Sequence, residues 1–189
     1  AHFCGFVFHP KSPRYIAPER AAALDSALIR RVGVFVNQDA EQIMDIMKTA
    51  RLEFAQLHGN QSLDCARRIG AGKVIRVLWP DSYDSLDAMQ REMDLWADSC
   101  SWFLLDAGRQ GGGHGTALDW KALASLQAPR PWFLAGGLSS ASLNRALEQC
   151  TPNGIDLNSG VEAIPGQKSP QKLLAALKPL ISYTPYHIA

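Results

Sequence analysis

Three features are scarce in this sequence: cysteine, long apolar runs and an excess of one charge. The four cysteines (Cys4, Cys65, Cys100 and Cys150) are widely spaced and form no CxxC pair, which favours buried thiols in a reduced, cytoplasmic compartment. No stretch approaches the ~18 apolar residues of a membrane span, and the first residues show no secretory signal. Because the net charge is +1, we expect neither nucleic acid nor a membrane surface as a partner.

No shift in composition marks a linker or a domain boundary in the chain. Its 189 residues are 47% hydrophobic and 20% charged, which is typical of a globular protein with a substantial core. We therefore predict a single domain over residues 1–189.

Short, mostly unbroken apolar runs recur along the sequence. This pattern is typical of strands that are buried on both faces of a parallel sheet. The seven runs are Phe3–Phe8, Val32–Val36, Phe54–Leu57, Val74–Leu78, Trp102–Leu105, Trp132–Leu134 and Ile155–Leu157.

Segments with helical periodicity lie between these runs. Pro18 suits a first helical turn, and Asp39 suits an N-terminal cap. Ile43, Met44 and Met47 form one predicted apolar stripe. The predicted helical segments span residues 17–29, 39–50, 139–150 and 169–181.

Alternating strands and helices predict an α/β fold, either an open doubly wound sheet or a (β/α)8 TIM barrel. A barrel needs eight βα units, and seven are evident here. If the fold is a barrel, we expect one βα unit to be missing before Ala1. In that case we expect the segment to have been removed or omitted, or to lie in another chain.

In such folds the chemistry lies at the carboxyl ends of the strands. Asp106 ends the apolar run WFLLD, where poor solvation would favour the protonated carboxyl group and suit a general acid. The alternative is an aspartate that caps the following loop. The sequence GGGHG in that loop is either a mobile lid or a plain flexible segment.

Pairs of small residues that contain glycine follow the last two predicted strands. Gly136-Gly137 and Ser159-Gly160 lack bulk, so their backbone N–H groups can approach a ligand closely. Each pair precedes a predicted helical segment whose N-terminus attracts anions, and barrels commonly hold a phosphate there. The alternative for Gly136-Gly137 is a tight turn.

Two basic residues follow earlier strands. Arg14 is either a ligand for a carboxylate or phosphate or a solvated cation. His58 is either a base, a ligand or an oriented structural histidine.

Six pieces of the sequence, in order, resemble the phosphoribosylanthranilate isomerase family of tryptophan biosynthesis. They are GFVFHPKSPRY, RVGVFVN, QLHGN, LLD with GGHGTALDW, LAGGL and DLNSGVEAIPGQK. The resemblance implies a (β/α)8 barrel without cofactor or metal. It also implies an Amadori rearrangement of N-(5-phosphoribosyl)anthranilate, a small phosphorylated substrate, to an open-chain deoxyribulose phosphate.

The same resemblance implies roles for the candidate residues. Asp106 matches the family's general acid, and Arg14 lies where the anthranilate carboxylate would bind. Asp156 matches a residue close to the active centre, and His58 matches a supporting strand-end histidine. The substrate phosphate would lie on Gly136, Gly137, Ser159 and Gly160.

The sequence departs from the family at the general base. The family carries that base as a cysteine in a CG pair at the end of its first strand. Cys4-Gly5 mimics the pair, but by register it lies near the start of the family's second strand. We therefore interpret Cys4 as a core residue and expect the 189 residues alone to lack their base.

Two other functions remain open from the sequence. One is a related sugar-phosphate barrel enzyme such as indole-glycerol-phosphate synthase, which would be expected to carry lysine or further carboxylates at strand ends. The other is a non-catalytic remnant that keeps the phosphate site.

Overall fold

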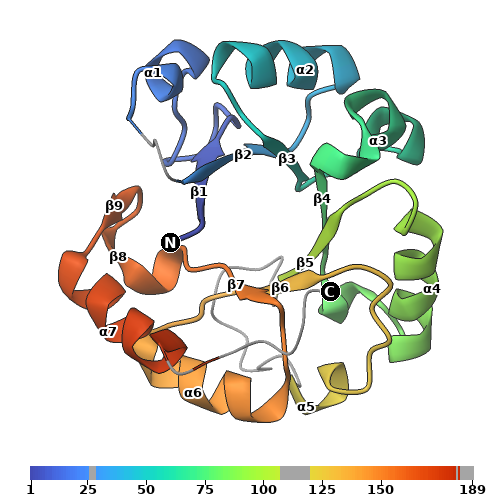
Figure 1. Ribbon diagram of the computed structural model, residues 1–189, viewed down its shortest axis with the longest axis vertical. Helices are drawn as coiled ribbons and strands as arrows, with labels where there is room; N and C mark the ends of the chain where they lie inside the picture. The colour runs from blue at the N-terminus through green and yellow to red at the C-terminus, as the bar shows by residue number, and fades with distance from the viewer. Residues whose placement is uncertain (26–28, 107–119, 182, 184–189) are drawn as a thin grey trace. The chain divides into compact units, whose positions relative to one another are not determined.

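The computed structural model describes residues 1–25, 29–106, 120–181 and 183 (Figure 1). The predicted GGGHG lid (residues 111–115) and most of the C-terminal tail lie outside these residues. The chain divides into two compact units. The first comprises Ala1–Val77 and Trp96–Trp102, and the second comprises Leu78–Leu95 and Phe103–Ala189.

The first unit is built on parallel strands that pair in chain order. They are β1 (Phe3–Val7), β2 (Arg30–Phe35), β3 (Phe54–Leu57) and β4 (Val74–Leu78, whose last residue belongs to the second unit). Strand β1 pairs with β2, β2 with β3, and β3 with β4. All four were predicted from apolar runs, and every residue of β3 is buried, as expected for a strand covered on both faces.

Helices α1 (Pro18–Ala22), α2 (Ala40–Thr49) and α3 (Leu63–Ile69) cover the strands of the first unit, and η1 (Ala71–Lys73) follows α3. Helix α2 has the predicted Asp39 cap: the Asp39 carboxylate accepts from the Gln42 N–H at 2.9 Å, and the Gln42 side chain accepts from the Asp39 N–H at 3.1 Å. The predicted stripe is partly wrong, because Ile43 and Met47 are buried but Met44 is exposed.

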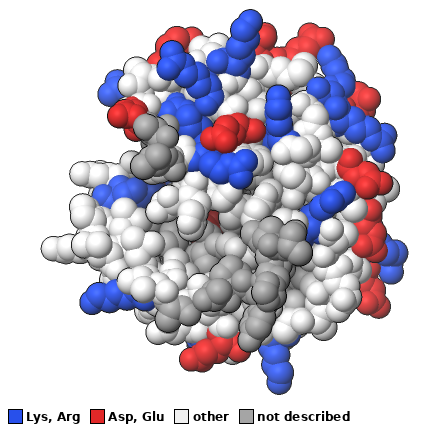
Figure 2. Space-filling model, in the orientation of Figure 1, with Lys and Arg blue, Asp and Glu red and all other residues white. Residues whose placement is uncertain are grey.

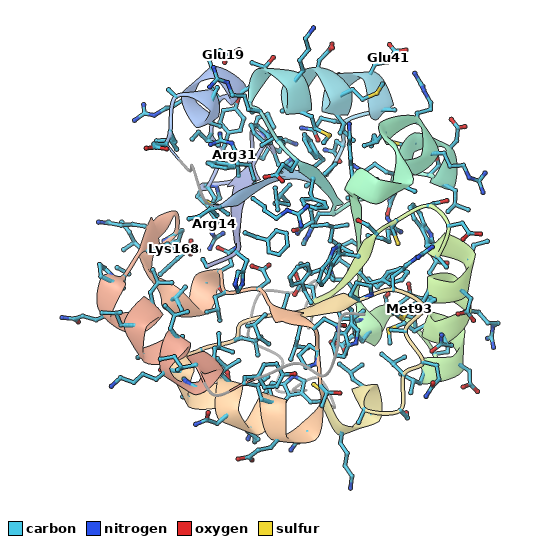
Figure 3. All side chains as sticks on the ribbon, in the orientation of Figure 1. Arg14, Glu19, Arg31, Glu41, Met93 and Lys168 are labelled. Carbon is cyan, nitrogen blue, oxygen red and sulfur yellow. The ribbon has the colours of Figure 1, made fainter. Side chains whose placement is uncertain are left out.

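Helix α1 ends well before the predicted limit at residue 29. The buried Arg31 guanidinium accounts for this end, because it donates to the backbone oxygens of Ala21 and Leu24. Its Nε donates to the Ala50 oxygen at 3.2 Å, beyond the end of α2. Figure 3 shows Arg31 reaching toward α1, whereas Glu19 and Glu41 point outward from their helices.

The second unit contains the remaining parallel strands. They are β5 (Trp102–Asp106, whose first residue belongs to the first unit), β6 (Trp132–Ala135) and β7 (Gly154–Ile155). Strand β6 pairs with β5 on one side and with β7 on the other. Strand β7 was predicted over Ile155–Leu157 but ends at Ile155, which leaves Asp156 just beyond the strand.

Several helices accompany these strands in the second unit. They are η2 (Pro80–Ser82), α4 (Leu86–Trp96), α5 (Trp120–Leu123), α6 (Ser140–Gln149), η3 (Ser159–Val161) and α7 (Pro170–Ile181). Helices α6 and α7 coincide with predicted segments. Helix α4 was not predicted, although its buried Met89 and Met93 have helical spacing.

A short antiparallel hairpin separates η3 from α7. Its strands are β8 (Glu162–Ile164) and β9 (Gln167–Lys168), and Glu162 pairs with Lys168. Gly166 in the turn has φ of 86°, a conformation that glycine adopts without strain. The sequence analysis did not predict this hairpin.

Side chains of both charges are interspersed on the face shown in Figure 2, in keeping with the net charge of +1. Within the described ranges, no helix is long and apolar enough to cross a membrane. The fold is α/β, with seven parallel strands separated by helices, as predicted for a (β/α)8 barrel with seven units evident.

Candidate active site

Two carboxylates lie at the carboxyl ends of strands in the second unit. Asp106 is the last residue of β5 and lies opposite Ala135 of β6. Asp156 follows β7, and its N–H donates to the Leu134 oxygen of β6 at 2.9 Å. Both aspartates are half-buried. Because β6 pairs with both strands, the two carboxylates flank the same end of β6.

The two carboxylates interact electrostatically. Burial, followed by the charge of Asp106, raises the pKa of Asp156 to about 6, and the Lys168 ammonium opposes this rise. A carboxyl group with this pKa can hold a proton close to neutral pH, which suits donation to a substrate oxygen. The expectation that Asp106 itself holds this proton stays a prediction.

The loop after β6 contains the first predicted glycine pair. Gly136 has φ of 96° and Gly137 has φ of 65°, so both adopt the left-handed conformation that favours glycine. This is the tight turn that we considered as an alternative. The turn leads into α6, where the Ser139 N–H donates to the Ser142 hydroxyl at 3.0 Å. The Ser142 and Leu143 N–H groups donate to the Ser139 oxygen. The N–H groups at the first positions of a helix have no acceptor within it, so the N-terminus of α6 is suited to an anion.

The loop after β7 packs against the loop after β6. A Cβ on Gly160 would lie 2.0 Å from the Leu138 oxygen, so only glycine allows this approach. The structure thus brings together the two glycine loops that the sequence singled out. One expectation is wrong: Ser159-Gly160 does not precede a long helix but lies in η3, because the β8–β9 hairpin intervenes before α7.

Sequence reasoning missed a charged network around η3. The Lys168 Nζ lies 3.1 Å from a Glu162 carboxylate oxygen, and the Glu162 side chain is almost fully buried. Lys168 also donates to the backbone and side-chain oxygens of Asn158. The Pro165-Gly166 dipeptide is a turn signal that could have revealed the hairpin and hence this pair.

His58 lies at the end of β3 in the first unit. Its N–H donates to the Phe35 oxygen at 2.8 Å, and its ring Nδ1 lies 3.4 Å from the amide nitrogen of the buried Gln56. Gly59 comes so close to Val36 that a Cβ would lie 1.9 Å from its oxygen. Arg76 donates to the Gly59 oxygen at 3.0 Å. His58 is thus held at the predicted strand end by defined contacts.

Arg14 lies in the first unit, in the loop after β1. Two backbone hydrogen bonds shape this loop, from Ser12 to the His9 oxygen and from Tyr15 to the Ser12 oxygen. The Arg14 N–H donates to the Ser12 hydroxyl at 3.1 Å, and the residue is half-buried. The loop is therefore ordered where the sequence placed an anion-binding arginine.

None of the four cysteines ends a strand that the structure describes. Cys4 is the second residue of β1, near the start of the strand, and pairs with Arg31. It is half-buried, so its interpretation as a core residue is wrong. Burial raises the pKa of Cys65 in α3, and it raises that of Cys150, just after α6, to about 11. Cys100 is buried before β5. The described part of the chain also contains no cluster of three or more His, Cys, Asp or Glu that could hold a metal ion.

Comparisons with known proteins agree with this arrangement. The family model of N-(5'-phosphoribosyl)anthranilate (PRA) isomerase matches residues 1–178. The N-(5'-phosphoribosyl)anthranilate isomerase of Desulfovibrio desulfuricans is 55% identical over 177 residues, which cover 94% of this chain and 84% of that protein.

Solved structures give the same result. The phosphoribosyl anthranilate isomerase of Thermotoga maritima superposes with a TM-score of 0.84 at 31% identity, covering 97% of this chain and 89% of that one. A phosphoribosyl anthranilate isomerase in complex with reduced 1-(o-carboxyphenylamino)-1-deoxyribulose 5-phosphate has a TM-score of 0.80 at 30% identity, with coverage of 97% and 89%. The chain therefore belongs to the N-(5'-phosphoribosyl)anthranilate isomerase family, whose members are enzymes of tryptophan biosynthesis.

Proposed function

We propose that this chain catalyses the Amadori rearrangement of N-(5-phosphoribosyl)anthranilate to 1-(2-carboxyphenylamino)-1-deoxyribulose 5-phosphate, with Asp106 as the general acid. The observation that carries the proposal is the interacting pair of Asp106 and Asp156 in the same unit as two touching glycine loops. The high identity to isomerases of this name supports the choice of substrate.

The reaction needs one proton donor and one proton acceptor. Asp106 gives its proton to the furanose ring oxygen, the bond from that oxygen to C1 breaks, and a Schiff base forms between C1 and the anthranilate nitrogen. A base then removes the proton from C2. The resulting enolic enamine takes up a proton at C1 from the protonated base and loses its C2 hydroxyl proton to the Asp106 carboxylate, which gives the ketone and restores both groups. The raised pKa of Asp156, next to the charge of Asp106, supports proton donation close to neutral pH at this strand end.

The substrate phosphate binds, in this proposal, to the backbone of Gly136, Gly137, Ser159 and Gly160. The N-terminus of α6 supports this assignment, because unpaired N–H groups and the helix dipole both favour an anion. The contact between Gly160 and Leu138 supports it further, because it brings the two loops together.

Arg14 binds the anthranilate carboxylate, and His58 has a supporting role. A guanidinium can grip a carboxylate through two parallel hydrogen bonds, and the ordered loop after β1 supports a defined position for Arg14. The contact between His58 and Gln56 supports an oriented ring. The contacts that support these two roles all lie within the first unit.

The general base is a cysteine that a further βα unit supplies, from the same polypeptide or from a partner chain. The positions of the four cysteines support this part of the proposal, because each lies away from a strand end. The free cysteines also support a cytoplasmic location. The prediction of one domain over residues 1–189 stays a prediction.

An assay of N-(5-phosphoribosyl)anthranilate tests the function. The protein carrying the additional βα unit should consume the fluorescent substrate and yield the deoxyribulose product by mass spectrometry, and Cys4→Ser should leave the rate unchanged. Loss of activity in Cys4→Ser would overturn the assigned register of β1. Conversion of the deoxyribulose product to indole-glycerol phosphate would instead favour the related synthase.

A further inference from the structure

We infer that Lys168 is a positioning residue for the reaction, which holds the turn at Asn158–Gly160 in the shape that receives the substrate phosphate. The inference rests on the proposed function, because it concerns the same phosphate loops. Lys168 belongs to β9 of the hairpin, outside the strand-end loops that carry the other candidate residues, and Figure 3 labels it there.

The contacts of Lys168 identify what it holds. Its Nζ lies 2.6 Å from the Asn158 side-chain oxygen, 3.0 Å from the Asn158 backbone oxygen and 3.1 Å from a Glu162 carboxylate oxygen. Asn158 is the residue directly before η3, and its backbone oxygen also accepts from the Val161 N–H at 3.3 Å. Lys168 therefore fixes the entry to the turn that contains Ser159 and Gly160.

These contacts exclude a direct role as a phosphate ligand. An ammonium group has three N–H donors, and the three acceptors of Lys168 account for all of them. A phosphate could bind the ammonium only by displacing an oxygen of Asn158 or Glu162. Lys168 therefore determines the conformation and the local charge of the loop, and it does not contact the substrate.

The Glu162 carboxylate holds the Lys168 ammonium in place. The residue is 5% exposed, and the carboxylate oxygen that contacts Lys168 also accepts from the Gly166 N–H at 3.1 Å. Its backbone oxygen accepts from the Lys172 Nζ at 2.7 Å. A buried carboxylate needs a charged partner and hydrogen bonds, so the position of the lysine head group is well determined.

The position of Asn158 also affects the loop after β6, because Gly160 contacts that loop. Gly160 lies against Leu138 with no room for a Cβ. A shift of η3 would therefore change the position of Gly160 relative to the turn at Gly136-Gly137. The link from Lys168 through Asn158 and Gly160 thus connects the hairpin to both proposed phosphate loops.

The charge of Lys168 also acts on Asp156. Among the described residues, Asp106 raises the pKa of Asp156 and Lys168 lowers it. Loss of the ammonium should therefore raise the pKa of Asp156 above its present value of about 6. The same charge would act on Asp156 whether or not Lys168 shapes the loop, so the phosphate readout carries the inference.

The test compares Lys168→Met with Lys168→Arg. For Lys168→Met we expect inorganic phosphate to inhibit about tenfold more weakly and KM to rise about tenfold, the scale of a lost charge-assisted contact. We expect the NMR titration of the Asp156 carboxyl carbon to move to higher pH. Lys168→Arg keeps the charge, so two of these changes, in phosphate inhibition and in the Asp156 titration, should be smaller than in Lys168→Met.

A matched control is Lys172→Met, which removes a neighbouring ammonium that bonds only to the Glu162 backbone among its described contacts. This variant should keep the phosphate inhibition constant and the Asp156 titration. Because Lys168→Met leaves a buried carboxylate, the double variant Lys168→Met/Glu162→Gln provides a second test if the single variant fails to fold. It should show the same two changes.

Unchanged phosphate inhibition in either folded variant would overturn the inference, whatever the Asp156 titration shows. The NMR titration needs no turnover. If the protein carrying the additional βα unit failed to isomerise the substrate but the titration still moved, the proposed function would fail while the electrostatic action of Lys168 on Asp156 stood.

Discussion

At the end of β3 in the first unit, His58 is positioned by a backbone hydrogen bond and the amide of Gln56. At the ends of β5 and β7 in the second unit, Asp106, Asp156 and Lys168 interact through their charges. Burial and a neighbouring charge raise the pKa of a carboxyl group, as they do for Asp156. In the proposed function, the acid–base chemistry therefore belongs to the second unit, and recognition and support belong to the first.

The largest effect that tests this comparison is on turnover. Asp106→Asn should lower kcat by ~10²–10⁴-fold, the usual contribution of a positioned acid. His58→Gln should lower kcat by less than about tenfold, because a supporting group does not transfer the proton. Both are measured by substrate fluorescence in the active enzyme, with Asp45→Asn on the exposed face of α2 as a control of unchanged activity. A greater loss in His58→Gln than in Asp106→Asn would reverse the comparison.

Close backbone packing is a property that the two units share. Gly160→Ala and Gly59→Ala each place a Cβ about 2 Å from a backbone oxygen, so each should lower the free energy of unfolding by about 2–4 kcal/mol. Chemical denaturation measures this loss. Gly72→Ala is the matched control, because no atom lies within 4 Å of its Cβ position. Equal stability of Gly160→Ala and Gly72→Ala would contradict the contact between the two glycine loops.

The charges of the second unit should make stability depend on pH. The pKa of Asp156 rises from 3.8 to about 6 on folding, so its contribution to stability is largest below pH 4 and is lost as the pH rises through 6. Asp156→Asn should therefore stabilise the protein at pH 8 by about 1–2 kcal/mol and leave it unchanged at pH 3.5. Thermal unfolding at both pH values measures the effect, and Asp45→Asn should show no such dependence. Equal stability of Asp156→Asn and the natural sequence at pH 8 would contradict the raised pKa.

The smallest expected effect concerns an exposed ion pair of the first unit. Arg68 and Glu41 lie 2.9 Å apart, but the Glu41 side chain is 77% exposed. Glu41→Gln should change the free energy of unfolding by less than about 0.5 kcal/mol, because water competes for both charges. Glu162→Gln should cost more, since its partner Lys168 would lose a buried counter-charge. Equal losses in the two variants would remove the energetic distinction between the units.

The sequence was sufficient to predict the seven strands and the Asp39 cap because these depend on local patterns. Unbroken apolar runs specify buried parallel strands, and a short polar side chain before a helix competes for its first N–H groups. The same patterns placed Asp106 at the end of β5 and both glycine pairs after β6 and β7. Periodic spacing of Met89 and Met93 was present in α4 but was not recognised.

The tertiary structure alone decided the features that depend on residues distant in the sequence. Arg31, from the next strand, donates to the carbonyl oxygen of Ala21 in α1 and to that of Leu24 just beyond the helix, so a side chain distant in the sequence satisfies oxygens at the end of α1. Gly160 is required because it packs closely against Leu138, whereas Gly137 is required because its φ is positive. The sequence alone does not distinguish these two reasons for a glycine. The pKa of Asp156 depends on Asp106 and Lys168. Burial and the distance between charges exist only after the chain has folded, so they cannot be obtained from residue order.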